Sequence, residues 1–127
     1  MAAERLGHAR GRILPDIVGP EMRVLFVGIN PAPGSARIGH YHQGRPGRRF
    51  WRLLVEGGLL RWGADPALAG SLQPPPGRYH DEYLLECGLG ITDLVKRPTR
   101  SARELSREEL EKGRRRVLRI IRRYTPR

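Results

Sequence analysis

The segment Arg23-Val-Leu-Phe-Val-Gly-Ile-Asn30 decides the fold of this chain. Its apolar run, from Val24 to Val27, consists of β-branched, aliphatic and aromatic residues without alternation of polar and apolar positions. Such a run predicts a strand that is buried on both faces, as in the centre of a parallel sheet. The turn residues that follow place Asn30 beyond the carboxyl end of this strand, where ligands of open α/β sheets collect.

The sequence downstream of this strand predicts helices and a second strand. Residues 30–49 contain four glycines and three prolines, which predict a long loop, and a long loop in a compact domain is often functional. Ser106 and Glu109 have the spacing of a capping box and predict the start of a final helix. Three further elements are expected, a helix, a short helix and a strand, over residues 50–60, 79–85 and 90–95. This order predicts the α/β class, with a parallel sheet flanked by helices.

The composition indicates one small domain with an anionic partner. The chain has 127 residues, and its 24 Lys and Arg against 13 Asp and Glu give a net charge of +11. Such a surplus favours nucleic acid as the partner, with an acidic membrane surface as the second candidate. The single cysteine, Cys87, excludes a disulfide framework and a four-cysteine zinc site. We find no apolar run of transmembrane length and no signal-peptide core in the sequence, so an intracellular, reducing compartment is expected.

The order of elements also suggests a division of the chain. Residues 1–22 are expected to form an N-terminal arm, with apolar side chains that can dock at Ile13, Leu14, Ile17 and Val18. Residues 23–127 are expected to form the N-terminal portion of a single α/β domain. Only two strands are evident, and a helix followed by a proline usually leads into another strand. The sequence therefore predicts an incomplete domain with an uncovered sheet edge.

The residues after the first strand hold the first candidate site. The amide of Asn30 can present its carbonyl to a water molecule and its NH₂ group to a substrate. An alternative is that Asn30 and Pro31 only start a turn. The loop matches neither the phosphate-binding P-loop, which needs a Gly-Lys-Ser/Thr sequence, nor the glycine-rich dinucleotide fingerprint.

Two further segments carry side chains suited to chemistry. Residues 39–44 hold the rings of His40, Tyr41 and His42, which could stack on a base, and three arginines that could hold phosphates follow at Arg45, Arg48 and Arg49. Residues 88–99 bring Thr92, Asp93 and Thr99 to the end of the second strand. Each segment has a structural alternative. Residues 39–44 would form an ordered loop before a core helix in which Phe50 is buried, and residues 88–99 would form the exit of a strand with helix-capping residues. Neither acidic nor cysteine ligands stand near the histidines, so no metal and no cofactor is expected.

Together these segments resemble the mismatch-specific uracil/thymine-DNA glycosylases of the uracil-DNA glycosylase superfamily. The resemblance starts near Pro15 and rests on ordered blocks at matching distances, namely residues 23–31, 39–41, 49–51, 88–99, 104–106 and 124–127. It implies a parallel sheet flanked by helices. It also implies hydrolysis of the N-glycosidic bond of uracil, or of thymine opposite guanine, after the nucleotide is flipped out of the duplex.

The resemblance implies roles for individual residues. Asn30 would position the attacking water, and Thr99 would help to hold it. Asp93 would contact the pyrimidine edge. The remaining substrate-binding residues would be Gly28, Ile29, Pro31, His40, Tyr41 and His42, with Tyr41 or His42 stacked on the base, and Arg45, Arg48 and Arg49 would bind DNA. The implied partner is double-stranded DNA that contains uracil or a mismatched pyrimidine, bound by a monomer in the cytoplasm of a bacterium, near the nucleoid.

The chain departs from the family pattern at several positions. Ala32 and Pro33 follow Asn30-Pro31 where glycine is common, and Arg48 stands where asparagine is usual. Asp93 would place a carboxylate near base carbonyls and change base preference. The family's second active-site segment, an Asn-Pro-Ser loop that supplies the wedge, is missing from these 127 residues, so little excision by them alone is expected. Two other hypotheses remain: a non-catalytic, basic nucleic-acid-binding fragment, and a nucleotide-binding module that holds phosphate at the loop from Asn30 to Gly34.

Overall fold

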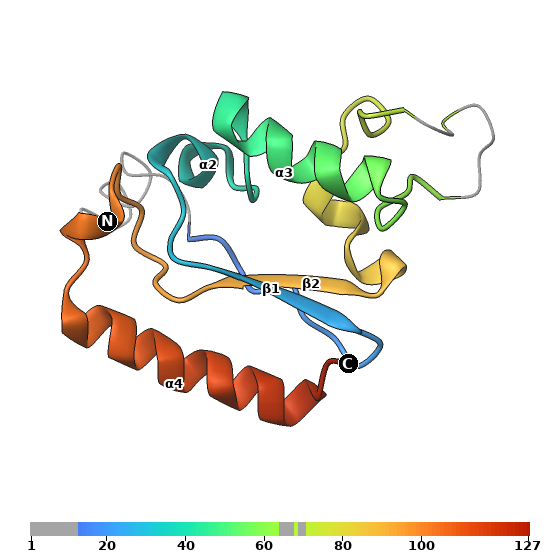
Figure 1. Ribbon diagram of the computed structural model, residues 1–127. Coiled ribbons are helices and arrows are strands. Elements are labelled where there is room, and N and C mark those ends of the chain that lie inside the picture. The colour runs from blue at the N-terminus through green and yellow to red at the C-terminus, as the bar shows by residue number, and fades with distance from the viewer. Residues whose placement is uncertain (1–12, 64–67, 69–70) are drawn as a thin grey trace, which may run out of the picture.

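A two-stranded parallel sheet lies at the centre of the molecule. The structure is a computed structural model and describes residues 13–63, 68 and 71–127. Strands β1 (Val24–Gly28) and β2 (Leu89–Asp93) pair in register, so that Gly28 lies opposite Asp93. Helix α4 (Arg107–Tyr124) covers one side of the sheet, and α2 (Pro33–Ile38) and α3 (Gly44–Glu56) lie on the other side (Figure 1). The prediction of an α/β fold with a parallel sheet flanked by helices is confirmed.

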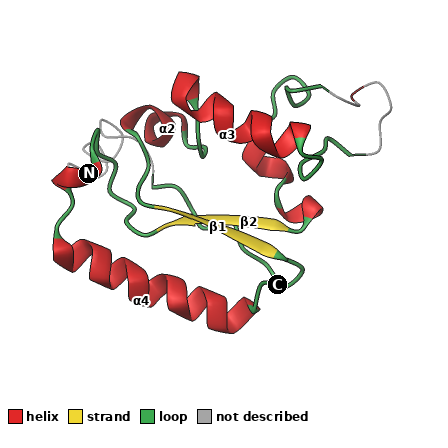
Figure 2. Cartoon of the chain, in the orientation of Figure 1, coloured by secondary structure: helices red, strands yellow, loops and turns green. Residues whose placement is uncertain are grey.

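Short helical turns and loops connect these elements (Figure 2). The turns are 3₁₀ helices and comprise η2 (His80–Tyr83), η3 (Leu85–Cys87) and η4 (Ala102–Glu104). The first two occupy most of the segment for which a short helix is expected. The predicted second strand begins one residue earlier than expected and ends at Asp93.

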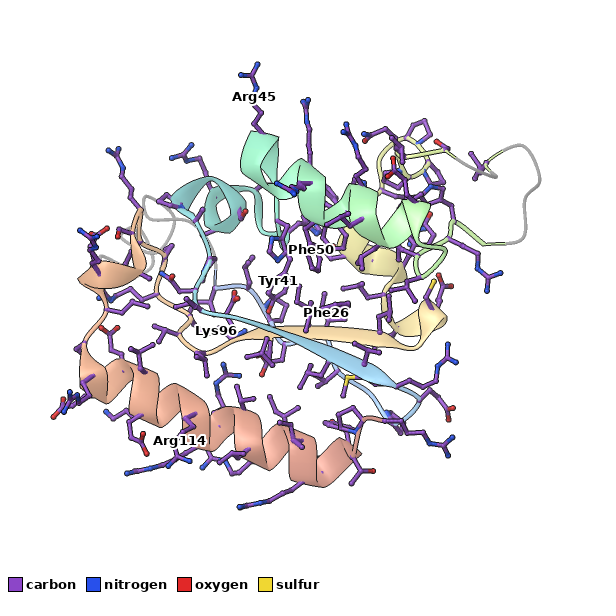
Figure 3. All side chains as sticks on the ribbon, in the orientation of Figure 1. Phe26, Tyr41, Arg45, Phe50, Lys96 and Arg114 are labelled. Carbon is purple, nitrogen blue, oxygen red and sulfur yellow. The ribbon has the colours of Figure 1, made fainter. Side chains whose placement is uncertain are left out.

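The main core fills the space between the sheet and α3. Ile91 of β2 is almost fully buried and packs in one cluster with Trp51 and Leu54 of α3. Phe26 of β1 and Phe50 of α3 point toward one another across this space, with ring centroids 5.3 Å apart in an edge-to-face arrangement (Figure 3). Phe50 packs against the cluster but is only partly buried, so the expectation of a buried core residue is met only in part. Burial of these large side chains is the main favourable contribution to folding.

The two strands differ in burial. Every residue of β2 is buried, whereas Val24 and Val27 of β1 remain 40% and 45% exposed. The prediction that the first strand is buried on both faces is therefore wrong. The reason is that β1 lies at the edge of the sheet. The central position belongs to β2, which pairs with β1 on one side and, on the other, with the segment before β1, where Ile17 forms an antiparallel bridge to Ile91. Within the described residues, the other edge of β1 has no strand partner.

The prediction of a long loop over residues 30–49 is also wrong. This segment contains α2 and the first six residues of α3, so the helix expected over 50–60 starts at Gly44 and ends at Glu56. Proline and glycine suggested a loop, but proline is well tolerated in the first helical turn, where the N–H has no intrahelical acceptor. Pro33 occupies this position in α2. Leu53 of α3 lies outside the buried face of the helix and is 60% exposed.

Helix α4 begins as predicted. The Ser106 hydroxyl accepts a hydrogen bond from the Glu109 N–H, and the Glu109 carboxylate accepts one from the Ser106 N–H. Most arginines of this helix are exposed, but Arg116 turns toward the sheet and pairs with Asp16. Among the helices that the structure describes, none is both long enough and apolar enough to cross a membrane.

Candidate active site

Asn30 lies two residues beyond β1 with its amide fixed in one orientation. Its Nδ2 donates to the carbonyl of Arg97 (2.9 Å) and to the hydroxyl of Thr99 (2.7 Å). The Arg97 carbonyl can only accept, so Nδ2 rather than Oδ1 must face it. Both amide protons are thus used within the protein, and the Asn30 carbonyl oxygen remains available to a water molecule. The predicted donation from this NH₂ group to a substrate does not fit this geometry.

Thr99 accepts the second hydrogen bond from the Asn30 amide nitrogen. It is 7% exposed, and its hydroxyl donates its only proton to the carbonyl of Ser101 (2.8 Å). A hydroxyl that already donates can bind a water molecule only as an acceptor. In this arrangement Thr99 fixes the direction of the Asn30 amide, which is a positioning role for the site.

A cavity of about 370 Å³ opens beside Asn30 at the carboxyl ends of the strands. Its volume is at the lower end of the range for small-molecule sites. The residues predicted from sequence that line it are Asn30, Pro31, Tyr41, His42 and Asp93. The structure therefore brings together side chains from three segments that are far apart in the sequence. Leu14, which precedes the sheet, contributes an apolar wall.

Tyr41 is anchored at both ends of its side chain. Only 2% of it is exposed, and its hydroxyl donates to the carbonyl of Pro15 (2.8 Å) while accepting from Nζ of Lys96 (3.1 Å). Burial, together with the nearby carboxylates of Asp93 and Asp16, raises the pKa of Tyr41 far above its usual value. The phenol is therefore neutral at physiological pH and rigidly placed (Figure 3).

His42 presents a second ring to the cavity. It stacks on Phe50 with a centroid distance of 4.1 Å, and its carbonyl accepts from Nε1 of Trp51 (2.8 Å). Burial lowers the pKa of His42 below its usual value of 6.5, so the imidazole is neutral near pH 7. Both predicted stacking residues thus lie at the cavity.

Asp93 ends β2 and carries an unusual carboxyl group. The residue is 5% exposed and lines the cavity. Burial raises its pKa to about 6, although the positive charges of Lys96 and Arg116 act in the opposite direction. Near neutral pH this group is divided between its acid and its carboxylate forms.

A charged network behind the cavity was not predicted from the sequence. Asp16 pairs with Lys96 (2.6 Å) and with Arg116 of α4 (2.6 Å), and it accepts a hydrogen bond from Thr92 of β2. Burial raises the pKa of Asp16, but the hydrogen bonds from Lys96 and Thr92 and the nearby positive charges lower it to a net value below 3.8. Asp16 and Arg116 are 100 residues apart, so no local pattern could reveal their contact.

Some of the predicted site residues lie elsewhere. His40 points to Asp81 (2.8 Å) and stacks on Tyr79 (centroids 3.7 Å apart), and it is not part of the cavity lining. Ile29 keeps half of its surface exposed, while its carbonyl accepts from the N–H of Val95 (2.9 Å). Gly28 is not part of the cavity lining, but it lies against the carboxyl group of Asp93, which is.

The three predicted DNA-binding arginines lie on α3. Arg45, Arg48 and Arg49 are exposed, and none of them pairs with a carboxylate of a described residue. Arg45 projects away from the body of the molecule (Figure 3). Within the described residues, no group of three or more potential metal ligands is found.

Comparison with known families agrees with this arrangement. A model of the Uracil DNA glycosylase superfamily matches residues 15–127. The match includes both strands, the cavity lining other than Leu14, and all residues for which a functional role is predicted.

Proposed function

Because the chain belongs to the uracil DNA glycosylase superfamily, we propose that it hydrolyses the N-glycosidic bond of uracil, or of thymine mispaired with guanine, in duplex DNA. A base within the stack is inaccessible, so the nucleotide must be flipped into a pocket. The observation that carries this proposal is the orientation of Asn30, whose two amide protons are used within the protein and which lines a cavity of suitable size at the strand ends.

In the proposed reaction Asn30 orients the attacking water. An amide oxygen accepts a hydrogen bond from water but is too weak a base to remove its proton fully. Departure of the base leaves an oxocarbenium-like sugar, which is highly electrophilic and needs little nucleophilic assistance. A well-placed, neutral acceptor is therefore sufficient, and Thr99 contributes by keeping that acceptor in place.

The proposed base pocket combines ring surfaces and polar groups. Tyr41 and His42 supply rings that lie against the base, and both are neutral, so neither ring adds charge to the pocket. Asp93 and the backbone near Ile29 are proposed to contact the polar edge of the pyrimidine. Stacking and edge recognition together would compensate for the energy of unstacking the nucleotide.

A single-turnover excision assay tests this function. The chain, completed with the family's second active-site segment, is incubated with labelled duplexes that contain one G·U, A·U or G·T pair, and abasic sites are measured after alkaline cleavage. We expect product from G·U, with slower or no product from an undamaged G·C duplex. Duplex binding without product from any of the three substrates would favour the non-catalytic nucleic-acid-binding alternative.

Duplex affinity is expected to depend on Arg45, Arg48 and Arg49. The logarithm of duplex affinity falls linearly with the logarithm of the salt concentration, and each phosphate that the protein neutralises contributes about 0.9 to the magnitude of this slope. Replacing all three arginines with alanine should therefore reduce the magnitude of this slope by about 3. Fluorescence anisotropy with an undamaged duplex at several salt concentrations measures it.

The matched control replaces two arginines of α4. Arg114 and Arg115 already pair with Glu111 on a solvated face, so Arg114→Ala with Arg115→Ala should leave the slope within about 0.5 of the parent value. Equal slopes for the parent and the α3 triple variant would show that DNA does not contact α3.

A further inference from the structure

A groove of about 470 Å³, here called the α4 groove, lies between α4 and the segment that follows β2. It shares no lining residue with the cavity beside Asn30. Five cations and one carboxylate line it, namely Lys96, Lys112, Arg115, Arg116, Arg119 and Glu109. Clustered cations in a concave surface focus a positive potential, so this groove is suited to an anionic ligand.

Two carboxylates near the α4 groove are occupied by other cations. Glu109 accepts two hydrogen bonds from the guanidinium of Arg97 (2.9 Å each), a residue outside the groove lining. Asp16 pairs with both Lys96 and Arg116 (2.6 Å each). A single carboxylate offsets only one of these two cations, so one positive charge of this group is not compensated.

The exposed face of α4 adds further charge to the groove. Arg115 lies 3.7 Å from the carboxylate of Glu111. Lys112 and Arg119 are exposed, and no carboxylate of a described residue pairs with either of them. Together with the cation that Asp16 leaves uncompensated, these two residues give the groove a surplus of three positive charges.

The α4 groove adjoins the Asn30 cavity at the segment that follows β2. Asp93 lines the cavity, and Lys96, three residues later, lines the groove. Nζ of Lys96 donates to the hydroxyl of Tyr41 (3.1 Å), a second residue of the cavity lining. Figure 3 shows Lys96 between Tyr41 and α4. A molecule that occupies the cavity and extends beyond it can therefore reach the groove.

The side chains of the groove suit a phosphate backbone better than a membrane surface. A helix that lies on a membrane inserts exposed apolar side chains between the lipids, beside its basic residues. The apolar residues of the groove are Leu94 and Val95; Val95 is 7% exposed and Leu94 is partly buried. Ile121, the exposed large apolar residue of α4, lies outside this groove and lines a depression beside β1 instead. Cations without such apolar neighbours fit the regular negative charges of DNA.

We propose that the α4 groove binds the sugar–phosphate backbone of the same duplex whose flipped nucleotide enters the Asn30 cavity. Lys112 and Arg119 contact phosphate oxygens, while Lys96 and Arg116 stay paired with Asp16 and strengthen the local positive potential. This inference rests on the proposed glycosylase function and extends the DNA interface from α3 to the other side of the sheet. Phosphate contacts position a duplex without reading its sequence, so the groove acts equally on damaged and undamaged DNA.

The first test measures how the affinity for an undamaged duplex depends on salt. Replacing both Lys112 and Arg119 with alanine should reduce the magnitude of the slope by about 1.8, since two phosphate contacts are lost. The matched control replaces Arg114 and Arg122, which are exposed on the same helix but do not line the groove. It removes the same charge and should leave the slope within about 0.5 of the parent value. Fluorescence anisotropy measures all three proteins.

The second test uses the parent chain without any substitution. Lys96 and Lys112 are the two lysines of the sequence, and both line the groove, so acetylation of lysine reports on this surface alone. The chain is treated with an acetylating ester, with and without duplex, and each lysine is quantified by mass spectrometry. With free duplex at about ten times its Kd, about 90% of the protein is bound, and acetylation of Lys112 should slow by up to about tenfold. Vesicles of phosphatidylcholine and phosphatidylserine, added in place of the duplex, should leave the rate unchanged.

The outcomes separate this inference from the proposed function, because neither test requires excision. Reduced slope and protection of Lys112, without excision of any uracil or mispaired thymine, would support the groove and contradict the proposed function. Excision together with equal slopes for the Lys112/Arg119 variant and its control would overturn the inference alone. Protection of Lys112 by vesicles but not by duplex, or binding of two duplexes per chain, would also overturn it.

Discussion

In a protein that also carries the family's second active-site segment, replacing Asn30 with alanine is expected to slow uracil excision by about 100-fold to 1,000-fold while changing duplex affinity by less than about tenfold. The side chain donates both amide protons to Arg97 and Thr99, and the residue lines the cavity, so its carbonyl oxygen remains available to water. Its loss removes the group that orients water, whereas the arginines of α3 that are proposed to hold DNA are unaffected. Single-turnover cleavage of a G·U duplex and an anisotropy titration measure the two quantities.

A matched variant distinguishes the role of Asn30 from a general loss of amide groups. Gln73 carries an amide outside the Asn30 cavity, and Gln73→Ala should excise uracil within about threefold of the parent rate. Thermal unfolding of both variants is recorded in parallel. Excision by Asn30→Ala at the parental rate would show that Asn30 and Pro31 form only a turn, and collapse of binding would show that Asn30 is structural.

Replacing Gly113 with alanine is expected to lower the free energy of unfolding by about 3 kcal/mol. Helix propensity alone predicts the opposite sign, since alanine is favoured over glycine within a helix by about 1 kcal/mol. The loss is expected because a Cβ atom at Gly113 would lie 1.9 Å from the carbonyl oxygen of Leu94. Helix α4 or the exit of β2 would have to move, and the melting temperature should fall by about 10 °C or more.

The neighbouring residue supplies the control for this helix. Lys112 is exposed on α4, and Lys112→Ala should change the free energy of unfolding by less than about 0.5 kcal/mol. Thermal denaturation followed by circular dichroism, at matched protein concentrations, measures both variants. A Gly113→Ala variant as stable as the parent would contradict the close packing of α4 against the backbone after β2.

Local sequence patterns determined the elements whose signals are short-range. The apolar run before Asn30 predicted β1, and residues 90–95 predicted most of β2, because strand preference depends on neighbouring side chains. The capping box at Ser106 predicted the start of α4, since its two hydrogen bonds join residues three apart. The position of Asn30 beyond a parallel strand predicted a ligand site there, and the structure has a cavity beside it.

Only the tertiary structure decided the burial of β1, the helices within residues 30–49 and the electrostatics of the site. Proline and glycine occur both in loops and in first helical turns, so their presence left α2 and the start of α3 undetermined. The pairing of Asp16 with Arg116 spans 100 residues of sequence. The protonation of Asp93 depends on burial and on charges from three separate segments. Such contacts are absent from the local sequence because they exist only after the sheet, α4 and the segment before β1 have packed together and excluded water.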